Sequence, residues 1–381
     1  MKSAILIPAY CPEQSLVKTA TRLVDLGIGD LMIVDDGSGP AYHEIFEELR
    51  LCGCHVAVHE VNRGKGAAIR TGITSLLALD PDLDCIITAD ADGQHRPVDI
   101  VRICDEASSK NGAFAPLILG TRDFSGDQVP RRSRFGNRFS SFYFKCSTGK
   151  ICPDTQTGLR AIPRRLFRLA LDTPGDRYDY EMNFLMAAAR ETPADAGPSF
   201  EPLAFVPIAA VYEEKNRSSH FRPIVDSFRV YKTPLKYICA SLISAAVDLT
   251  IFTILAKMGQ AAASGIFLAT VGARVISGIV NFSLNRRWSF SANRAVQGSA
   301  GKQGIRYFTL FISQMLASWA LVTAFSFLPL SLTGVKVIVD TLLAVVSFFM
   351  QQNWVFRRDR KTGTAQSRTR TPSGTVQAVI R

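Results

Sequence analysis

Two carboxylates, Asp90 and Asp92, follow directly after the apolar run 84–89, whose β-branched residues are typical of a buried parallel strand. Acidic side chains just past such a strand lie at the carboxyl edge of an open α/β sheet, where ligands bind. These two acids offer hard oxygen ligands and Gln94 offers a neutral one, a set that suits Mg²⁺ or Mn²⁺ bridging to a diphosphate. The alternative is a solvated acidic turn that caps a helix starting near Pro97.

The first 120 residues alternate between short apolar runs of strand length and longer amphipathic stretches. The strand-like runs are 4–7, 31–34, 56–61, 85–88 and 117–120. The helix-like stretches between them are 13–26, 40–51, 65–79 and 97–107. This alternation predicts an α/β domain with a mostly parallel sheet and helices on both faces.

Polar residues also follow the other predicted strands. Tyr10 comes after the first, and Asp36 comes after the second, where an acid suits ribose hydroxyls or a base edge. Lys65, between two glycines at the start of a predicted helix, offers backbone N–H groups and a cation to a phosphate, although the P-loop spacing is absent. Each of these polar groups alone fits an ordinary turn with a helix cap. Four such groups at successive strand ends predict one ligand-binding crevice.

Further motifs carry a resemblance to a known family. They are Gly120-Thr121-Arg122, Phe135-Gly136-Asn137-Arg138, Asp154-Thr155-Gln156-Thr157-Gly158-Leu159-Arg160, Tyr178-Asp179-Tyr180-Glu181 and Arg217-Ser218-Ser219-His220-Phe221. With them, residues 1 to about 232 resemble glycosyltransferase family 2, most closely its polyprenyl-phosphate mannose or glucose synthases. The resemblance implies a GT-A-like fold that binds a nucleotide-diphosphate sugar.

The resemblance also implies roles for individual residues. Those expected to bind the donor substrate are Pro8, Tyr10, Glu13, Asp36 and Lys65, and those expected to hold Mg²⁺ or Mn²⁺ are Asp90, Asp92 and Gln94. The family often has Asn-Glu after the tyrosine, whereas this chain has Cys11, Pro12 and then Glu13.

The acceptor side is expected around Asp154. A lipid phosphate is already anionic near neutral pH, so Asp154 is expected to orient the acceptor or the sugar rather than to act as a general base. Gln156 is expected to contact substrate. Four arginines, Arg122, Arg131, Arg138 and Arg217, would clamp the two phosphates that must meet. For each arginine the alternative is a solvated or lipid-facing charge. Direct displacement at the anomeric carbon would invert its configuration.

Two basic stretches rich in aromatic residues, about 131–146 and 219–233, are typical of helices that lie in the plane of lipid headgroups. Nucleic acid is the rival partner for basic aromatic stretches, and we disfavour it because membrane spans follow immediately. Anionic membrane lipids are therefore the expected partners of these segments.

Four apolar segments, about 237–256, 265–284, 307–328 and 335–354, approach the length that spans a bilayer. The second and fourth end in Trp-x-Phe, at Trp288 and Trp354, so the segments predict two repeated helix hairpins. Residues 236–357 resemble the GtrA-type four-helix membrane family, in which Arg274, Ser277, Asn281 and Asn285 belong to the motif. Basic inner loops predict that both termini and the first domain are cytoplasmic.

Asp248 and Arg274 lie 12 residues from Lys236 and Arg286, so they should share one membrane depth and form an interhelical pair; Asp340 is the poorer partner. Charges at such depth indicate function or a purely structural pair.

The sequence thus predicts a 1–235 catalytic domain, a 236–357 membrane domain and a basic disordered tail at 358–381, which carries much of the net charge of +11. The eight cysteines contain no paired C-x-x-C units and are expected to be reduced.

The predicted activity is metal-dependent, inverting transfer of one hexose from a nucleotide-diphosphate sugar, either UDP-glucose-like or GDP-mannose, to a polyprenyl phosphate. A homo-oligomer is expected. The alternatives are a flippase for the lipid-linked sugar and a processive polysaccharide synthase, whose Q-x-x-R-W signature is absent.

Overall fold

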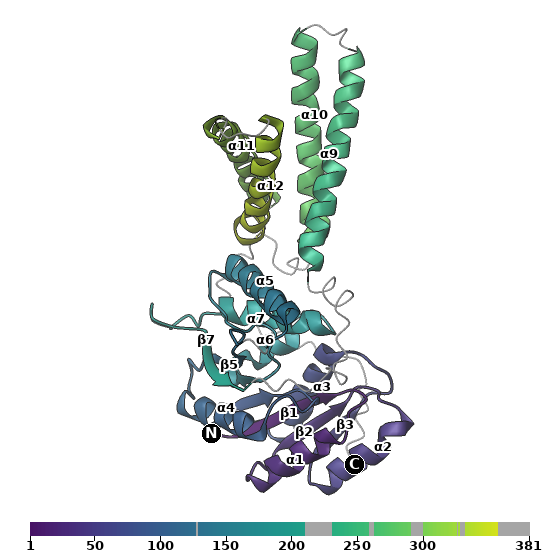
Figure 1. Cartoon of the computed structure of the whole chain (residues 1–381), viewed down its shortest axis with the longest axis vertical. Coiled ribbons are helices and arrows are strands. Elements are labelled where there is room, and N and C mark those ends of the chain that lie inside the picture. The colour runs from purple at the N-terminus through teal and green to yellow at the C-terminus, as the bar shows by residue number, and fades with distance from the viewer. Residues whose placement is uncertain are drawn as a thin grey trace. The chain divides into compact units, whose positions relative to one another are not determined.

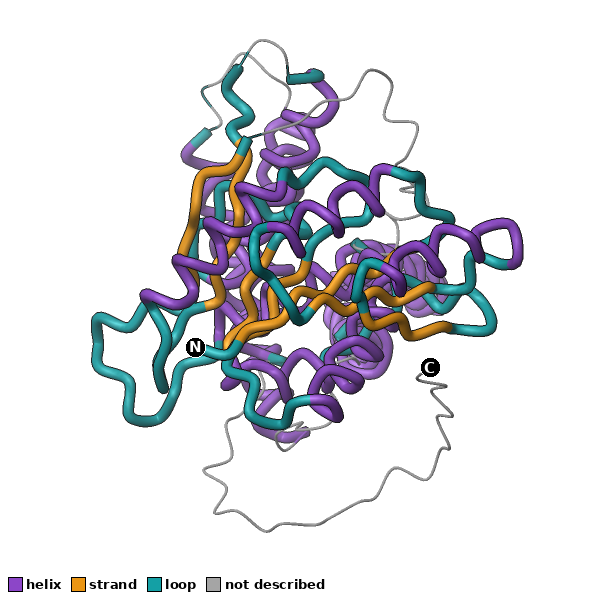
Figure 2. The backbone as a smooth tube through the Cα atoms, turned by 90° about the horizontal axis from the view of Figure 1, so that it is seen from below, coloured by secondary structure: helices purple, strands orange, loops and turns teal. Residues whose placement is uncertain are grey.

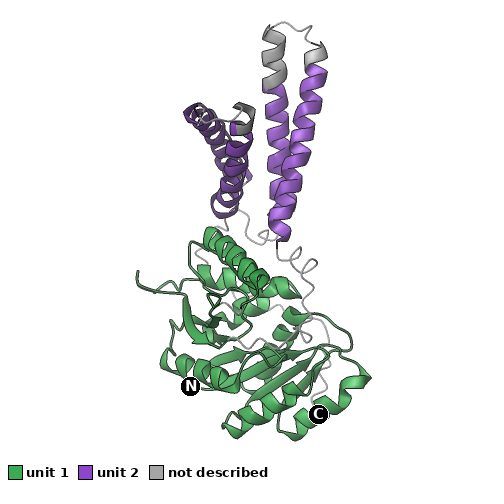
Figure 3. Ribbon diagram, viewed as in Figure 1, with its two compact units in different colours: residues 1–230, 371–381 green, residues 231–370 purple. Residues whose placement is uncertain are grey.

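The computed structural model describes residues 1–126, 129–209, 231–258, 263–290, 300–325, 327 and 332–356. The chain divides into two compact units, residues 1–230 with 371–381 and residues 231–370 (Figure 3). Three predicted features lie outside the described residues: Arg217, most of the 219–233 segment, and the tail at 358–381.

A seven-stranded sheet forms the centre of the first unit, in the order β3-β2-β1-β4-β6-β5-β7 (Figure 1). Its strands are β1 (Ser3–Ala9), β2 (Leu31–Asp35), β3 (His55–Val58), β4 (Cys85–Thr88), β5 (Leu117–Arg122), β6 (Arg160–Pro163) and β7 (Leu203–Ile208). Only β6 runs antiparallel to its neighbours β4 and β5. The predicted α/β architecture with a mostly parallel sheet is confirmed.

Helices cover both faces of this sheet (Figure 2). They are α1 (Ser15–Asp25), α2 (His43–Leu51), α3 (Lys65–Leu79), α4 (Pro97–Ser109), α5 (Arg131–Thr148), α6 (Phe167–Asp172) and α7 (Tyr178–Arg190). Alternate residues of β1 enter two different cores, as the period of two of a strand requires. Leu6 packs with the α3, α6 and α7 side, whereas Ile5 and Ile7 pack with the α1, α2 and α4 side.

The expected third strand, 56–61, is wrong at its end, because β3 stops at Val58. The backbone N–H of His59 still donates to the carbonyl oxygen of Asp35 over 2.8 Å, and its ring bonds to Asp36 just after β2, with Nδ1 and Oδ1 2.7 Å apart. The chain then turns close over Gly37: a Cβ added at Gly37 would lie 2.4 Å from the carbonyl carbon of Val61.

In the part of the second unit that the structure describes there are four long helices, α9 (Lys232–Met258), α10 (Ala263–Leu284), α11 (Ala300–Ala324) and α12 (Leu332–Met350). Within its described residues, three stretches are long and apolar enough to cross a membrane: Lys232–Leu255, Ala300–Ala324 and Val337–Val355. A π-helical turn follows α10 at Asn285–Ser289 and another follows α12 at Gln351–Val355. The two hairpins therefore end alike, as the Trp-x-Phe repeat predicts.

Candidate active site

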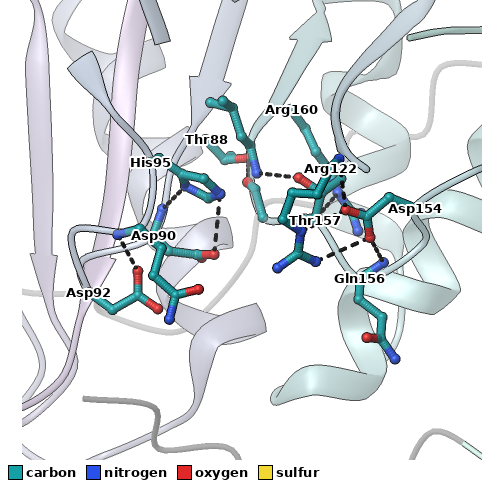
Figure 4. Close-up of polar contacts among 12 residues, drawn as sticks. Thr88, Asp90, Asp92, His95, Arg122, Asp154, Gln156, Thr157 and Arg160 are labelled. Atoms are coloured by element: carbon teal, nitrogen blue, oxygen red, sulfur yellow. Dashed lines mark hydrogen bonds and ion pairs between the residues drawn. The ribbon is translucent and has the colours of Figure 1, made fainter. Parts of the chain in front are cut away.

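The loop after β4 holds the two predicted metal ligands beside a buried histidine (Figure 4). The backbone N–H of Asp90 donates to Nδ1 of His95 over 3.1 Å, so the other ring nitrogen carries the proton when the ring is neutral. That nitrogen, Nε2, lies 3.9 Å from Oδ2 of Asp90. Burial lowers the pKa of His95, which favours the neutral ring. The buried ring of His95 therefore stabilises the conformation of the Asp90 loop.

Asp92 is the acid in this loop whose charge is least compensated. Burial and then the charge of Asp90 raise its pKa, while the backbone N–H of Gln94 donates to its Oδ1 over 3.1 Å. Two carboxylates this close repel each other when both are charged. A divalent cation would neutralise both. In the described part of the chain, no three or more His, Cys, Asp or Glu side chains form a ready metal cage. The side-chain oxygens of Asp90, Asp92 and Gln94 are of the donor type that Mg²⁺ or Mn²⁺ prefers.

Lys65 links this loop to α7. Its Nζ lies 2.5 Å from Oδ1 of Asp90 and 2.9 Å from Oε1 of Glu181. Burial alone would lower the pKa of Lys65, but the charges of Asp90 and Glu181 outweigh it and raise the pKa. Burial would likewise raise the pKa of Asp90, and the charge of Lys65 reverses that effect and lowers the pKa. Lys65 and Asp90 are therefore both charged at neutral pH.

Gly158 brings the Asp154–Arg160 motif against Asp90. A Cβ at Gly158 would overlap both carboxylate oxygens of Asp90, so any larger residue there would displace that carboxylate. The hydroxyl of Thr88 in β4 donates to the carbonyl oxygen of Gly158 over 2.9 Å. Because β6 pairs antiparallel with β4, the loop before β6 lies at the carboxyl end of β4.

Arg122, at the end of β5, is held by a fully buried Asp154. Its Nε donates to Oδ2 over 2.8 Å and its Nη2 donates to Oδ1 over 3.1 Å, which is a bidentate pair. The backbone N–H of Gln156 donates to Oδ1 over 3.0 Å. Figure 4 shows this cluster across from Asp90, Asp92 and His95. The Arg122 side chain keeps partial exposure, so it presents a fixed cation to the crevice.

Arg160 is a buried cation that sequence reasoning left without a role. Its Nε donates to the carbonyl oxygen of Thr157 and its Nη1 to that of Glu181, both over 2.9 Å. It therefore ties the Asp154 loop to α7.

Helix α5 supports the same loop from the other side. The Asn137 side chain donates to the carbonyl oxygen of Pro153 over 2.7 Å, and the hydroxyls of Ser140 and Thr155 lie 2.6 Å apart. The predicted phosphate ligands Arg131 and Arg138 are exposed on this helix. The structure thus places Arg122, Asp154 and Gln156 in one group and these two arginines on the adjacent helix.

On the donor side, Tyr10 and Glu13 are exposed after β1, and Pro8 is partly buried in it. Asp36 is buried and accepts the backbone N–H groups of Arg63 and Gly64 over 2.9 and 2.7 Å. Its carboxylate thereby shapes the turn that precedes Lys65. Its expected contact with a nucleotide stays a prediction, and the histidine partner, His59, was missed because no local pattern marks it.

In the membrane unit, Nε of Arg274 lies 3.8 Å from Oδ1 of Asp248, as expected for an interhelical pair. The hydroxyl of Ser277 donates to the same Oδ1 over 2.8 Å. Asp340 accepts instead from the hydroxyl of Ser318 over 2.6 Å.

Comparison with known families agrees with this geometry. Residues 4–169 match Glycosyl transferase family 2, and residues 236–367 match the GtrA/DPMS transmembrane domain. The chain carries a glycosyltransferase family 2 domain followed by a GtrA/DPMS transmembrane domain. It is therefore a glycosyltransferase and a membrane protein.

Three relatives of this glycosyltransferase are similar to it over about half of its length. An uncharacterized protein of Methanocaldococcus jannaschii is 29% identical over 218 residues, which cover 56% of this chain and 83% of that protein. The UDP-N-acetylglucosamine–dolichyl-phosphate N-acetylglucosaminyltransferase of Methanococcus voltae is 29% identical, over 43% of this chain and 70% of that protein. The undecaprenyl-phosphate mannosyltransferase of Micrococcus luteus is 25% identical, over 49% of this chain and 78% of that protein. Among solved structures, the glucosyl-3-phosphoglycerate synthase of Mycobacterium tuberculosis is weakly similar, with 17% identity and a TM-score of 0.42 over 62% of this chain and 76% of that one.

Proposed function

We propose that this glycosyltransferase moves one hexose from a nucleotide-diphosphate sugar to a polyprenyl phosphate, with inversion, at the cytoplasmic face of the membrane. The observation that carries the proposal is the nearness of two charged groups at the carboxyl ends of β4 and β5, the Asp90–Asp92 loop and the Arg122–Asp154 pair. The names of the relatives from M. voltae and M. luteus support a polyprenyl-phosphate acceptor.

The donor diphosphate would bind at the acidic loop. Asp90, Asp92 and Gln94 would hold a divalent cation there, which neutralises charge on the leaving diphosphate. Lys65 would supply a second cation to the same diphosphate from the start of α3. Tyr10 and Glu13, exposed after β1, lie at the same edge of the sheet for contact with the nucleoside.

The acceptor phosphate would bind at Arg122. Its oxygen attacks the anomeric carbon, the carbon–oxygen bond to the diphosphate breaks, and the nucleoside diphosphate leaves with the bonding electrons. No proton has to be removed from a phosphate anion, so Asp154 can remain locked to Arg122 throughout. Arg131 and Arg138 on α5 would bring the lipid headgroup to this site.

Helix α5 would hold the acceptor site at the membrane surface. Phe135, Phe139 and Phe142 are exposed on it at helical spacing, next to exposed arginines. An exposed aromatic stripe with basic flanks is typical of a helix at the level of lipid headgroups.

The experiment is transfer of label into lipid. Purified full-length protein, Mn²⁺ and undecaprenyl phosphate are incubated with each of a panel of radiolabelled nucleotide sugars, and the lipid is extracted. Label from one donor, abolished by a chelator and by Asp92→Asn but retained by the exposed control Asp25→Asn, supports the proposal. Nucleotide binding without label from any donor would overturn it.

A second candidate function rests on Arg274. Its side chain is 63% exposed within a membrane-spanning hairpin, where a charge marks a functional position by default. The membrane unit would then move the lipid-linked sugar across the bilayer. Arg274→Gln in proteoliposomes that keep normal transfer but accumulate product in one leaflet would favour it, and unchanged product distribution would remove it.

A further inference from the structure

Lys65 is shared between two carboxylates that come from distant parts of the sequence. Asp90 follows β4 and Glu181 lies in the first turn of α7, and Lys65 contacts both within 3 Å. All three side chains are at least three-quarters buried. The ammonium therefore already neutralises Asp90, one of the two acids expected to hold the metal.

The local packing builds this arrangement. At Gly64, φ is +100°, and an added Cβ would lie 2.4 Å from the carbonyl oxygen of Asp176 just before α7. The backbone N–H of Ala67 donates to the same oxygen over 3.2 Å. Arg70 donates to the carbonyl oxygen of Gly175 over 2.7 Å. The start of α3 is thus fixed against the start of α7, which holds Lys65 and Glu181 together.

We infer that Glu181 is a positioning residue that sets metal affinity, because it holds Lys65 whenever Lys65 releases Asp90. This inference rests on the proposed function, since it takes Asp90 and Asp92 as the metal ligands. An ammonium and a divalent cation repel each other across one carboxylate, so Lys65 must leave Asp90 before both acids can serve a metal. When no nucleotide is bound, Lys65 still has Glu181 as an anionic partner after it leaves Asp90.

A bound diphosphate gives Lys65 another partner. Lys65 can then leave Asp90 at lower cost, so a nucleoside diphosphate should tighten metal binding. The coupling is reciprocal: the metal should tighten nucleotide binding by the same factor. Lys65 thereby adds to the coupling that direct contact between the metal and the diphosphate would already give.

The first test is Mn²⁺ binding to the full-length protein in detergent, measured by calorimetry with and without saturating UDP or GDP. Glu181→Gln should weaken Mn²⁺ binding about tenfold without nucleotide, the order of a lost hydrogen bond to a charged group. The nucleotide should restore most of that loss. Equal weakening in both conditions, or none in either, would contradict the inference.

The matched control is Glu201→Gln. Glu201 also pairs with a lysine, Lys150, at 3.0 Å, but on the exposed surface away from the crevice. Its loss should leave Mn²⁺ binding unchanged in both conditions.

The second test removes Lys65, and the expected change in Mn²⁺ affinity has the opposite sign. Lys65→Met removes the competitor of the metal, so it should tighten Mn²⁺ binding about tenfold without nucleotide, the order of one hydrogen bond to a charged group. The nucleotide should then tighten Mn²⁺ binding less than it does in the wild-type protein. A purely structural Lys65 would give weaker binding instead. Wild-type protein that binds no Mn²⁺ would refute the proposed metal site itself, whereas normal Mn²⁺ binding with no tightening in Lys65→Met would refute only this inference.

Discussion

Arg122 reaches Asp154 through two parallel N–H···O bonds, and both oxygens of that buried carboxylate already accept further backbone N–H groups. Asp154 therefore has no open oxygen with which to take a proton from a substrate. Its role is to hold the guanidinium of Arg122 in one orientation, which agrees with an acceptor that is already an anion.

Replacing Asp154 by Asn should destabilise the protein by about 3–5 kcal/mol, because it leaves a partly buried guanidinium without its counter-charge. Arg122→Lys keeps the charge but loses the two-pronged geometry, so kcat/KM should fall by about tenfold or more with little change in stability. Thermal unfolding in detergent and the lipid-extraction assay measure the two effects. Equal stability losses in both variants would contradict this division of roles.

Gly158→Ala should abolish transfer. The new methyl group would overlap both oxygens of Asp90 and force that carboxylate out of place, at a stability cost of about 1–3 kcal/mol. Gly29→Ala is the control, since a Cβ there meets nothing within 4 Å. Normal transfer by Gly158→Ala would show that the position of Asp90 does not matter for the reaction.

The buried thiols should resist alkylation at pH 8. Burial raises the pKa of Cys54 to about 11, and thiolate is the reactive form, so its reaction with iodoacetamide should rise only as the pH approaches 11. Burial raises the pKa of Cys85 and Cys152 to about 12, so they should react even later. Partly exposed Cys52, two residues from Cys54, is the internal control, and all sites should react in denaturant. Mass spectrometry of the peptides reads out each site, and early labelling of Cys54 would contradict the fold of this loop.

Each single charge reversal at Asp248 or Arg274 should lower the yield of folded protein, and exchanging the two residues should restore that yield. Asp248→Arg places two like charges at one membrane depth and should lower folded yield, as should Arg274→Asp. The double variant recreates an opposite-charge pair across α9 and α10. Yield of monodisperse protein in detergent measures this, and a double variant no better than either single one would exclude a functional contact between the two residues.

The parts of the fold that were predictable from sequence are those with strong local patterns. Helix α3 and strand β4 begin and end where periodicity placed them, and the loop with Asp90 and Asp92 follows β4 as expected. Strands β6 and β7 were not predicted, since β6 has four residues that include Arg160 and Pro163, and β7 contains Pro207. Neither shows the alternation that marks a strand.

Within the site, residue types were predictable but pairings were not. The sequence marks Lys65 as a cation for phosphate, but its contact with Glu181 depends on how α3 meets α7, 116 residues along the chain. Arg160 likewise shows its role only once the carbonyl groups it bonds are folded around it.

The position of β6 has a consequence for biosynthesis. Until residues 160–163 leave the ribosome, β4 and β5 have no strand between them, and each presents an unpaired edge. Unpaired edges are where growing chains associate with one another. Strand β6 closes the edge of β4 and one edge of β5, and β7 then closes the other edge of β5; both strands precede the first membrane helix at Lys232 in the chain. A nascent chain paused shortly before Arg160 should therefore be the species that most needs a chaperone.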